Sequence, residues 1–383
     1  MRASILTTIP FLLLLITGCT FDNTIPEESL PERVEWELVK NNTVKISDNI
    51  GYFSNSLEGM HIGVTKDRQS VFLYNSDNGD FNTVSIAGEG PDKTGEIFQA
   101  AMLNKETFLV MDITYAYTYN LEGTQLSKCG PLIDRVNYDR YSLPIVISEK
   151  EIMTTALSPY IEINSPDYFD NNSNFFYAKV NLETCEVITG GELSPDNIYR
   201  KDFFAVRMRP KIVQVTESTF VSNFPFNKEI DVISSKDFTI EKTIKLNPEN
   251  FGVLSTATGS YIEDQVNIIQ SNSAYRHLLP SSSTGLIMTQ YKTGMDKIIP
   301  ADELMAQGDN SKIGGKKYLE LYNIESGAKL GKDLLFNKSL IPLSFIDLNN
   351  VNFYSTSFED QEGMFLHSYK VNIKEKIKAE LQK

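Results

Sequence analysis

Cysteine is scarce in this chain. The 383 residues include three cysteines, Cys19, Cys129 and Cys185. This is too few for the disulfide framework that holds small secreted domains together. Cys129 and Cys185 fall in what we interpret as neighbouring repeat units. We expect them to be two separate, unbonded core or turn residues, with a disulfide between them as the alternative.

Histidine is equally scarce, and motifs of catalysis or metal binding are missing. His61, His277 and His367 are far apart and lack the paired spacing of a metal site such as H-E-x-x-H. No G-x-S-x-G nucleophile elbow and no D-x-D-x-D-G calcium loop occurs. We therefore expect no metal and no cofactor. A glycosidase carboxylate pair leaves no sequence motif, so that class stays open.

Positive charge is also in short supply. Lys and Arg number 36 against 50 Asp and Glu, which gives a net charge of −14. A chain of this sign is poorly suited to bind phosphate backbones, and we expect no nucleic-acid partner.

A hydrophobic run long enough to span a membrane is missing too. The apolar segment before Cys19 is interrupted by Thr7, Thr8 and Pro10 and falls short of the roughly 20 residues that a span needs. Arg2 precedes it, and small residues lead directly into Cys19, which is the layout of an export signal. We expect a signal peptide at residues 1–18, a flexible tether at 19–35 and a folded body at 36–383.

The residues around Cys19 carry a resemblance. Ile16-Thr17-Gly18-Cys19 resembles the lipobox of bacterial lipoproteins. The resemblance implies that Cys19 is acylated and becomes the new N-terminus, and that the lipid anchors the protein to a membrane of the cell envelope. The outer membrane is the expected one, with the protein in the periplasm or at the cell surface.

Short alternating runs separated by polar turns fill the rest of the chain. Residues 70–74 and 81–86 flank the turn Asp77-Asn78-Gly79-Asp80, and Asn-Gly favours a tight hairpin. Similar turns are centred near residues 123, 184, 237, 326 and 374. Their spacing is roughly 40–60 residues, except for a gap about twice as long that ends at 326. This gap predicts a further, degenerate unit around residues 286–291.

The repeat predicts an all-β fold. Units of this length with about four short strands each are typical of β-propeller blades. We predict one propeller domain with seven blades; six blades is the alternative, and two β-sandwich domains are the rival architecture. Ile373, Ile377 and Leu381 recur every four residues among charges, which predicts a short C-terminal helix over residues 373–383.

A second resemblance lies in the segment AGEGPDKTGE, residues 87–96. The matching positions are Gly88, Gly90, Pro91, Gly95 and Glu96. The segment resembles an inter-blade loop of exported Gram-negative lipoproteins, of the Bacteroidetes type, with unassigned function. The resemblance implies a lipid-anchored propeller of six or seven blades and brings no catalytic residue with it.

Two groups of residues are candidates for ligand binding. Arg207, Arg209 and Lys211 alternate along an expected strand and would project to one face, where they could hold an anion or a carboxylate. Surface cations neutralised by neighbouring acids are the alternative. Tyr160, Tyr168 and Phe169 belong to a long acidic segment, and aromatic side chains on such loops often contact sugars or proteins.

The leading functional hypothesis is recognition of a protein, small molecule or glycan without turnover. The alternative is a glycan-active hydrolase or lyase whose carboxylates are scattered in the sequence. Convergent carboxylates in the central channel would favour the enzyme, whereas an aromatic and cationic lining would favour binding.

Overall fold

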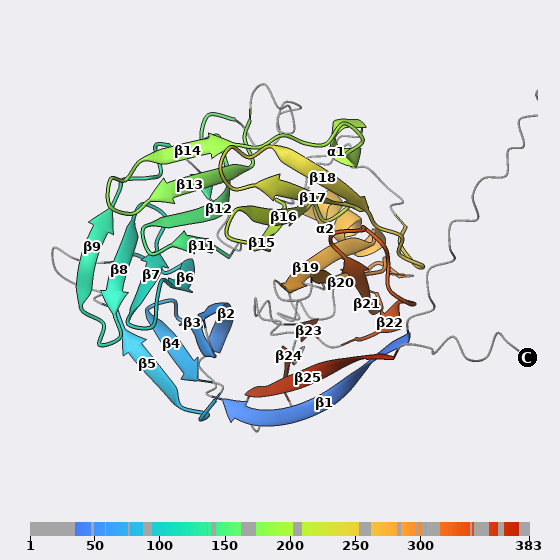
Figure 1. The fold of residues 1–383 in the computed structure, drawn as a ribbon, viewed down its shortest axis with the longest axis horizontal. Helices are drawn as coiled ribbons and strands as arrows, with labels where there is room; N and C mark the ends of the chain where they lie inside the picture. The colour runs from blue at the N-terminus through green and yellow to red at the C-terminus, as the bar shows by residue number, and fades with distance from the viewer. Residues whose placement is uncertain are drawn as a thin grey trace, which may run out of the picture.

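The strands of the protein form a ring of six sheets (Figure 1). The computed structural model describes residues 35–46, 50–57, 59–75, 77–86, 94–135, 137–138, 143–161, 174–201, 209–252, 262–281, 285–295, 297–300, 303, 315–337, 339–340, 352–358 and 364–374. All pairings between the described strands are antiparallel, and the first strand of each sheet lies nearest the centre of the ring. The fold is therefore a β-propeller, as the repeat predicts.

The first three blades follow one another along the chain. Blade 1 consists of β2 (Ile50–Leu57), β3 (Met60–Thr65), β4 (Ser70–Asn75) and β5 (Phe81–Ser85). Blade 2 consists of β6 (Gln99–Met102), β7 (Thr107–Met111), β8 (Ala116–Asn120) and β9 (Gln125–Cys129). Blade 3 consists of β10 (Asn137–Tyr138), β11 (Ile145–Ser148), β12 (Glu151–Leu157), β13 (Tyr177–Asn181) and β14 (Val187–Gly190).

The other three blades complete the ring. Blade 4 consists of β15 (Lys211–Gln214), β16 (Thr219–Asn223), β17 (Glu229–Ser234) and β18 (Ile240–Lys245). Blade 5 consists of β19 (Ala274–Ser281), β20 (Leu286–Lys292), β21 (Lys317–Asn323) and β22 (Leu334–Leu335). Blade 6 consists of β23 (Ser339–Leu340), β24 (Asn352–Phe358), β25 (Met364–Lys374) and β1 (Glu35–Ile46). Two helices of the described residues, α1 (Ile198–Lys201) and α2 (Ile262–Ser271), lie in connections between blades.

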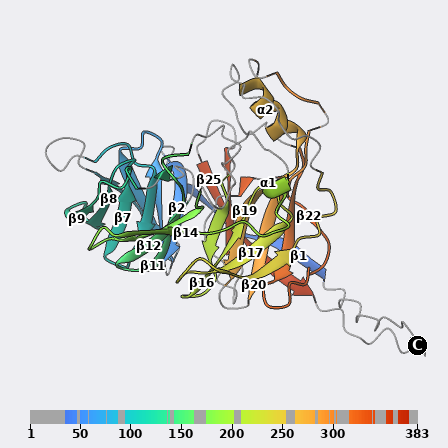
Figure 2. The ribbon, with the colours of Figure 1, turned by 90° about the horizontal axis from the view of Figure 1, so that it is seen from above.

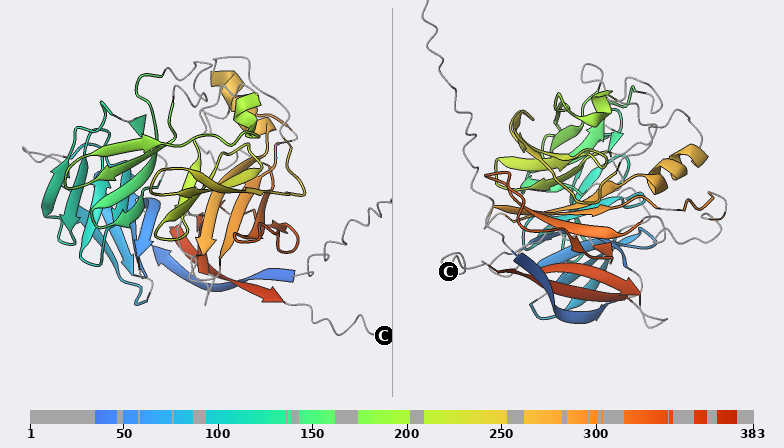
Figure 3. Two further views of the ribbon diagram at one scale, coloured as in Figure 1. Left: turned by 45° about the horizontal axis from the view of Figure 1, so that its top comes forward. Right: turned by 90° about the vertical axis from the view of Figure 1, so that its right-hand side faces the viewer.

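The ring is closed by a pair of strands from opposite ends of the sequence. β1 pairs with β25 from Glu35↔Lys374 to Ile46↔Met364, so the first described strand is the outer strand of the last blade (Figure 3). Ile373 lies in this pairing and not at the start of a helix. The predicted C-terminal helix is therefore wrong at its first residue; residues 375–383 lie outside the described part of the chain.

The number of blades is six, not the seven that the spacing favoured. The predicted extra unit around residues 286–291 is β20, and it pairs with β21 in blade 5. The long gap contains the connection 246–273, which carries α2, and the connection 293–316 between β20 and β21. Extra length in connections, not an extra sheet, stretches the repeat. The predicted turn near residue 374 is wrong, because Lys374 ends β25 in a pair with Glu35 and β1 supplies the outer strand of this blade.

The repeated turns do connect the third and fourth strands of blades 1 to 5. In each, the last residue of the third strand accepts a backbone hydrogen bond of 2.8–3.0 Å from a residue of positive φ. The accepting and donating residues are Asn75 and Gly79, Asn120 and Gly123, Asn181 and Cys185, Ser234 and Phe238, and Asn323 and Gly327. The Asn or Ser side chain caps a further backbone N–H of the turn, as in Asn181 Oδ1 with Glu183 N at 2.9 Å. These local bonds explain why Asn recurs at the strand ends.

The hydrophobic core is divided among the seams between blades. Each seam has its own cluster of buried side chains; Phe108 and Tyr119, for example, stack at 5.7 Å between blades 1 and 2. The seam of blades 5 and 6 packs Trp36 and Tyr369 against Met288. Burying one such side chain stabilises the fold by about 1.5–3 kcal/mol. The alternating apolar residues of the strands therefore hold neighbouring blades together.

Long connections gather at one end of the ring. Because every blade is antiparallel, the connections from second to third strand and from one blade to the next lie at the end where the first strands begin. The long ones among these span residues 158–176, 191–210, 246–273 and 293–316. Figure 2 shows α1 and α2 on this side, which we call the insertion end. No helix among the described residues is long and apolar enough to cross a membrane.

The loop that carries the second resemblance is only partly described. Residues 87–93 lie outside the described residues. Gly95 does not adopt a positive φ, so glycine's conformational freedom is not what this position requires. Its N–H donates to Asp112 Oδ2 at 3.0 Å, and the neighbouring Thr94 hydroxyl bonds Tyr119 OH at 2.6 Å. Side-chain contacts to blade 2 hold this end of the loop.

Candidate functional site

The predicted binding residues lie partly in the described structure. Cys19, Arg207, Tyr168 and Phe169 fall outside the described residues. Lys211 is the first residue of β15, and Arg209 lies just before it, so both belong to the insertion end. Tyr160 follows β12 at the same end; its side chain is 86% exposed, and its hydroxyl donates to Asp134 O at 3.5 Å. The structure places Tyr160 in blade 3 and the two cations at blade 4, as separate features.

Four residues of blade 5 join Lys211 to form a cluster of positive charge. Ala274, Lys292 and Lys317 stand side by side at the ends of β19, β20 and β21. Arg276 lies in a bulge of β19 and is followed by His277. β15 and β19 are neighbouring inner strands, so Lys211 lies on the side of this group nearest blade 4. We call Lys211, Arg276, His277, Lys292 and Lys317 the cation cluster.

Members of the cation cluster influence one another electrostatically. Burial, together with the charges of Lys211, Arg276 and Lys317, lowers the pKa of His277 to about 3. At neutral pH the imidazole is therefore uncharged and offers one donor and one acceptor. All three neighbouring charges that act on His277 among the described residues are positive.

Lys292 is the most deeply buried member of the cluster. Its side chain is fully buried, and its Nζ donates to the backbone oxygen of Ile269 in α2. Burial and the charge of Arg276 lower the pKa of Lys292 to about 7. The same two causes lower the pKa of Lys317. Cations that are partly removed from water and repel one another are stabilised by an anion that approaches them.

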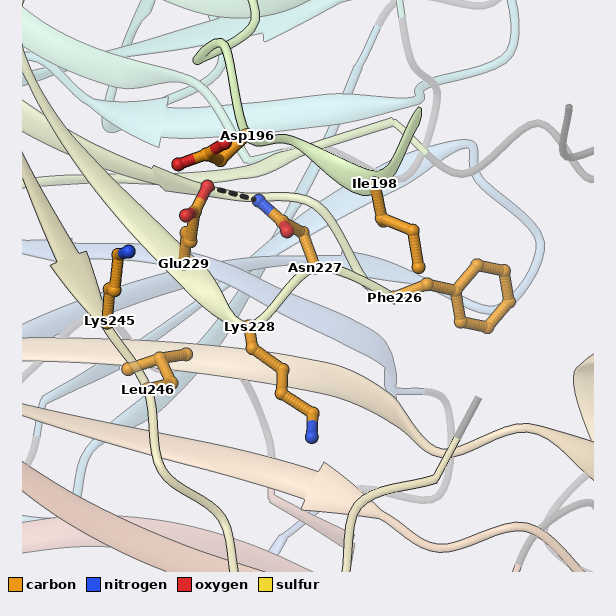
Figure 4. Close-up of a pocket in the computed structure, with 8 residues that line it drawn as sticks. All are labelled: Asp196, Ile198, Phe226, Asn227, Lys228, Glu229, Lys245 and Leu246. Atoms are coloured by element: carbon orange, nitrogen blue, oxygen red, sulfur yellow. Dashed lines mark hydrogen bonds between the residues drawn. The ribbon is translucent and has the colours of Figure 1, made fainter. Parts of the chain in front are cut away.

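A second feature of the insertion end is a pocket on blade 4. It has a volume of about 450 Å³ (Figure 4). The polar side chains around it are Asp196, Asn227, Lys228, Glu229 and Lys245, and the apolar ones are Ile198, Phe226 and Leu246.

Hydrogen bonds fix the acidic wall of this pocket. Glu229 is 8% exposed, and its Oε2 accepts bonds from Ser194 Oγ at 2.9 Å and from Asn227 Nδ2 at 3.3 Å. Asn223 Nδ2 donates to the backbone oxygens of Asn227 and Glu229 at 3.0 and 2.7 Å. Figure 4 shows the Asp196 carboxylate facing that of Glu229. The pocket therefore offers the fixed carboxylate of Glu229 and the exposed carboxylate of Asp196 on one wall.

A buried acidic network lies deeper, between blades 4 and 5. Glu320 accepts hydrogen bonds from Tyr275, Thr289 and Tyr322 at 2.8–3.2 Å and forms an ion pair with Lys329 at 3.3 Å. Asp333 also pairs with Lys329 and accepts bonds from Tyr291 OH at 2.5 Å and Glu249 N at 2.8 Å. The many protein partners of these two carboxylates fit a structural role, because they tie the connection after β18 to blade 5.

Sequence reasoning missed most of the cation cluster and both acidic features. Arg276 and His277 are adjacent in sequence, but Lys292 and Lys317 reach them only through strand pairing. The available signal was local: Lys292 and Lys317 stand at the ends of the apolar runs 286–291 and 318–324. No group of three or more His, Cys, Asp or Glu side chains placed to hold a metal ion occurs in the described part of the chain.

Comparison with known proteins supports the fold. No protein-family model and no curated protein sequence matches this chain. The structure of a DUF4221-family protein from Bacteroides vulgatus is similar, with a TM-score of 0.64 at 13% identity, over 90% of this chain and 99% of that one. A candidate exported protein from Bacteroides fragilis has a TM-score of 0.53 at 12% identity, over 89% and 96% of the two chains. At such low identity the likeness shows the β-propeller fold alone.

Proposed function

We propose that the protein is a lipid-anchored, extracytoplasmic β-propeller that binds an anionic ligand at the insertion end of its ring without turning it over. The cation cluster is the observation that carries the proposal. Positive charge is the minority charge in this chain of net charge −14, yet four Lys and Arg side chains and the uncharged His277, from four strands, gather there.

The side chains of the cluster suit a carboxylate, sulfate or phosphate group. The Arg276 guanidinium can donate two parallel hydrogen bonds to such a group, and Lys211 and Lys317 add point charges. A bound anion would favour the charged form of Lys292, whose pKa lies near 7. The exposed Tyr160 at the same end could pack on a sugar ring or a peptide of a longer ligand.

The proposed location rests on two observations. Cys19 stands in a lipobox-like segment, and the similar Bacteroides fragilis protein is described as exported. Metabolic labelling with a fatty-acid probe tests the anchor. We expect label on the wild-type chain and none on Cys19→Ser; equal labelling of both would contradict the lipoprotein assignment.

Binding of acidic and neutral ligands tests the function. The purified full chain should bind oligosaccharides that carry uronic acid or sulfate, measured on a glycan array and by calorimetry, and should not bind their neutral counterparts. Arg276→Gln should weaken binding at least 10-fold, because one bidentate charged contact is lost. Lys236→Gln changes an exposed lysine at the opposite end and should leave affinity unchanged. Equal loss in both variants, or equal binding of neutral ligands, would contradict the proposal.

The blade 4 pocket supports a second candidate function, glycan hydrolysis. The carboxylates of Asp196 and Glu229 face each other on one wall of it, and a carboxylate pair is what glycosidases use. Glu229→Gln should then abolish release of reducing sugar from a glycan that the wild-type chain cleaves. Binding without any release of product favours the recognition protein.

A further inference from the structure

Cys129 and Cys185 meet across the seam between blades 2 and 3. Cys129 is the last residue of β9 and is buried, whereas Cys185 lies half-buried in the turn between β13 and β14. Both contribute to the apolar cluster of this seam, beside Leu132 and Val187. The sequence favoured two separate thiols. The structure describes both as free, yet it brings them together.

One backbone oxygen connects the two residues. The Cys129 thiol donates to Asn181 O at 3.7 Å, and the backbone N–H of Cys185 donates to the same oxygen at 2.9 Å. Cys185 is also the neighbouring side chain that, after burial, contributes most to raising the pKa of Cys129. Arg135, in the connection after blade 2, donates to Cys185 O at 2.7 Å and fastens the turn to the neighbouring blade. The two residues therefore lie side by side across the seam, bonded to the same carbonyl oxygen, and a disulfide requires such close neighbours.

The backbone of Cys185 gives independent evidence. Its φ is +59°, and Gly79, Gly123 and Gly327 occupy the equivalent position in three other blades. A side chain with a Cβ is strained there, so glycine would serve the turn better. The Phe238 side chain at the equivalent position in blade 4 packs at 6.1 Å from Tyr177, which compensates for its strain. A bond between the Cys185 and Cys129 sulfur atoms would compensate for the strain at Cys185 in the same way.

We propose that Cys129 and Cys185 are a redox site, which forms a disulfide between blades 2 and 3 when the protein meets an extracytoplasmic oxidant that carries a disulfide. The half-buried Cys185 thiolate attacks one sulfur of the oxidant and forms a mixed disulfide, and the oxidant's other sulfur leaves as a thiol. Cys129 then gives up its proton and attacks the Cys185 sulfur, which frees the oxidant's second sulfur as a thiol. Two thiols of this chain become one disulfide, and the oxidant takes up two electrons and two protons.

The order of the two attacks follows from burial. Burial and the neighbouring Cys185 thiol raise the pKa of Cys129 to about 12. Cys129 is therefore protonated at neutral pH, and a thiol is a poor nucleophile until its proton leaves. Cys185 is the accessible partner and reacts first. The product closes a covalent loop from blade 2 to blade 3, so this seam cannot open without a reductant.

Treatment of the folded full chain with glutathione disulfide tests the proposal. Alkylation in denaturant followed by peptide mass spectrometry separates this pair from Cys19. We expect both thiols to be alkylated before treatment, and a peptide pair linked through Cys129 and Cys185 afterwards. The oxidised chain should melt about 5 °C higher than the reduced chain, and dithiothreitol should reverse the shift.

Two single variants make the test decisive. Cys129→Ala should stop at the mixed disulfide, with glutathione retained on Cys185. Cys185→Gly keeps the positive φ of the turn and should show no rise in melting temperature with oxidant. The proposal is overturned if the wild-type chain also retains glutathione on Cys185, if both thiols stay reduced in the folded chain, or if the new disulfide joins two molecules.

Discussion

Blades 1 and 2 differ from blades 4 and 5 in what their seams contain. The seam of blades 1 and 2 is lined mainly by apolar and aromatic side chains, with Phe108 and Val110 fully buried, and the buried Asp112 accepts a hydrogen bond from Tyr117 beside it. The seam of blades 4 and 5 encloses Glu320, which is fully buried. The connections at the insertion end are also longest around blades 4 and 5. The comparison indicates that blades 1 and 2 are the regular part of the ring, whereas long connections and a buried charge network make blades 4 and 5 the irregular part.

Removal of Glu320 is the most direct way to break this comparison. Glu320→Ala deletes the acceptor for three hydroxyl groups and leaves Lys329 with one carboxylate partner fewer. Breaking a buried charge network costs about 3–5 kcal/mol. Urea denaturation should therefore show a loss of that size. A loss below about 1 kcal/mol would mean that the network contributes no more than an exposed ion pair.

Phe108→Ala is the matched control in the apolar seam and should cost a similar 3–5 kcal/mol. The two variants should separate by pH. Burial and the neighbouring Asp333 raise the pKa of Glu320, so its contribution to stability falls as pH rises above the pKa of the unfolded chain. The cost of Glu320→Ala should therefore be larger at pH 5 than at pH 8. The cost of Phe108→Ala should be equal at both, since no titrating group is removed.

The carboxyl group of Asp231 in blade 4 provides a second pH-dependent contribution to stability. It is 4% exposed in β17, and burial raises its pKa to about 6, although Thr243 Oγ1 donates to it at 2.7 Å. The folded state binds this proton more tightly than the unfolded state, so stability from Asp231 is present below pH 4 and is lost as pH rises through 6. Asp231→Asn should stabilise the protein by about 1–3 kcal/mol at pH 8 and change little at pH 4. Equal effects at the two pH values would contradict the shift.

The features that the sequence predicted are local ones, and those that it did not predict depend on distant parts of the chain. The blade turns were predictable because Asn at a strand end and Gly at a positive φ act within one hairpin, as with Asn120 and Gly123. The blade count was not, since the connections 246–273 and 293–316 together lengthen the spacing between two turns to that of two repeats. Pairing of β1 with β25 joins opposite ends of the domain, and no local pattern reports it.

The candidate site was predictable only at Lys211. Its partners Arg276, Lys292 and Lys317 lie on three other strands, and their register depends on how blade 5 pairs. The contact between Cys129 and Cys185 likewise arises from the angle between two blades. Alternation within one strand cannot reveal such contacts, because they depend on the curvature of the whole ring.

The smallest loss of stability is expected from substitutions in the turns of blades 1 and 2. Two glycines there differ in how closely the neighbouring blade packs against them. Gly79 and Gly123 both have positive φ, of 79° and 83°. A Cβ at Gly79 would meet open space, whereas at Gly123 it would lie 2.9 Å from Val84 Cγ1 and 3.1 Å from Ser85 O. Gly79→Ala should therefore cost only the backbone strain of about 1 kcal/mol. Gly123→Ala should cost about 1 kcal/mol more, because blade 1 must shift to admit the methyl group. Thermal melts of the two variants, compared with the wild-type chain, measure the difference. Equal melting temperatures would show that blade 2 is not packed against blade 1 at this turn.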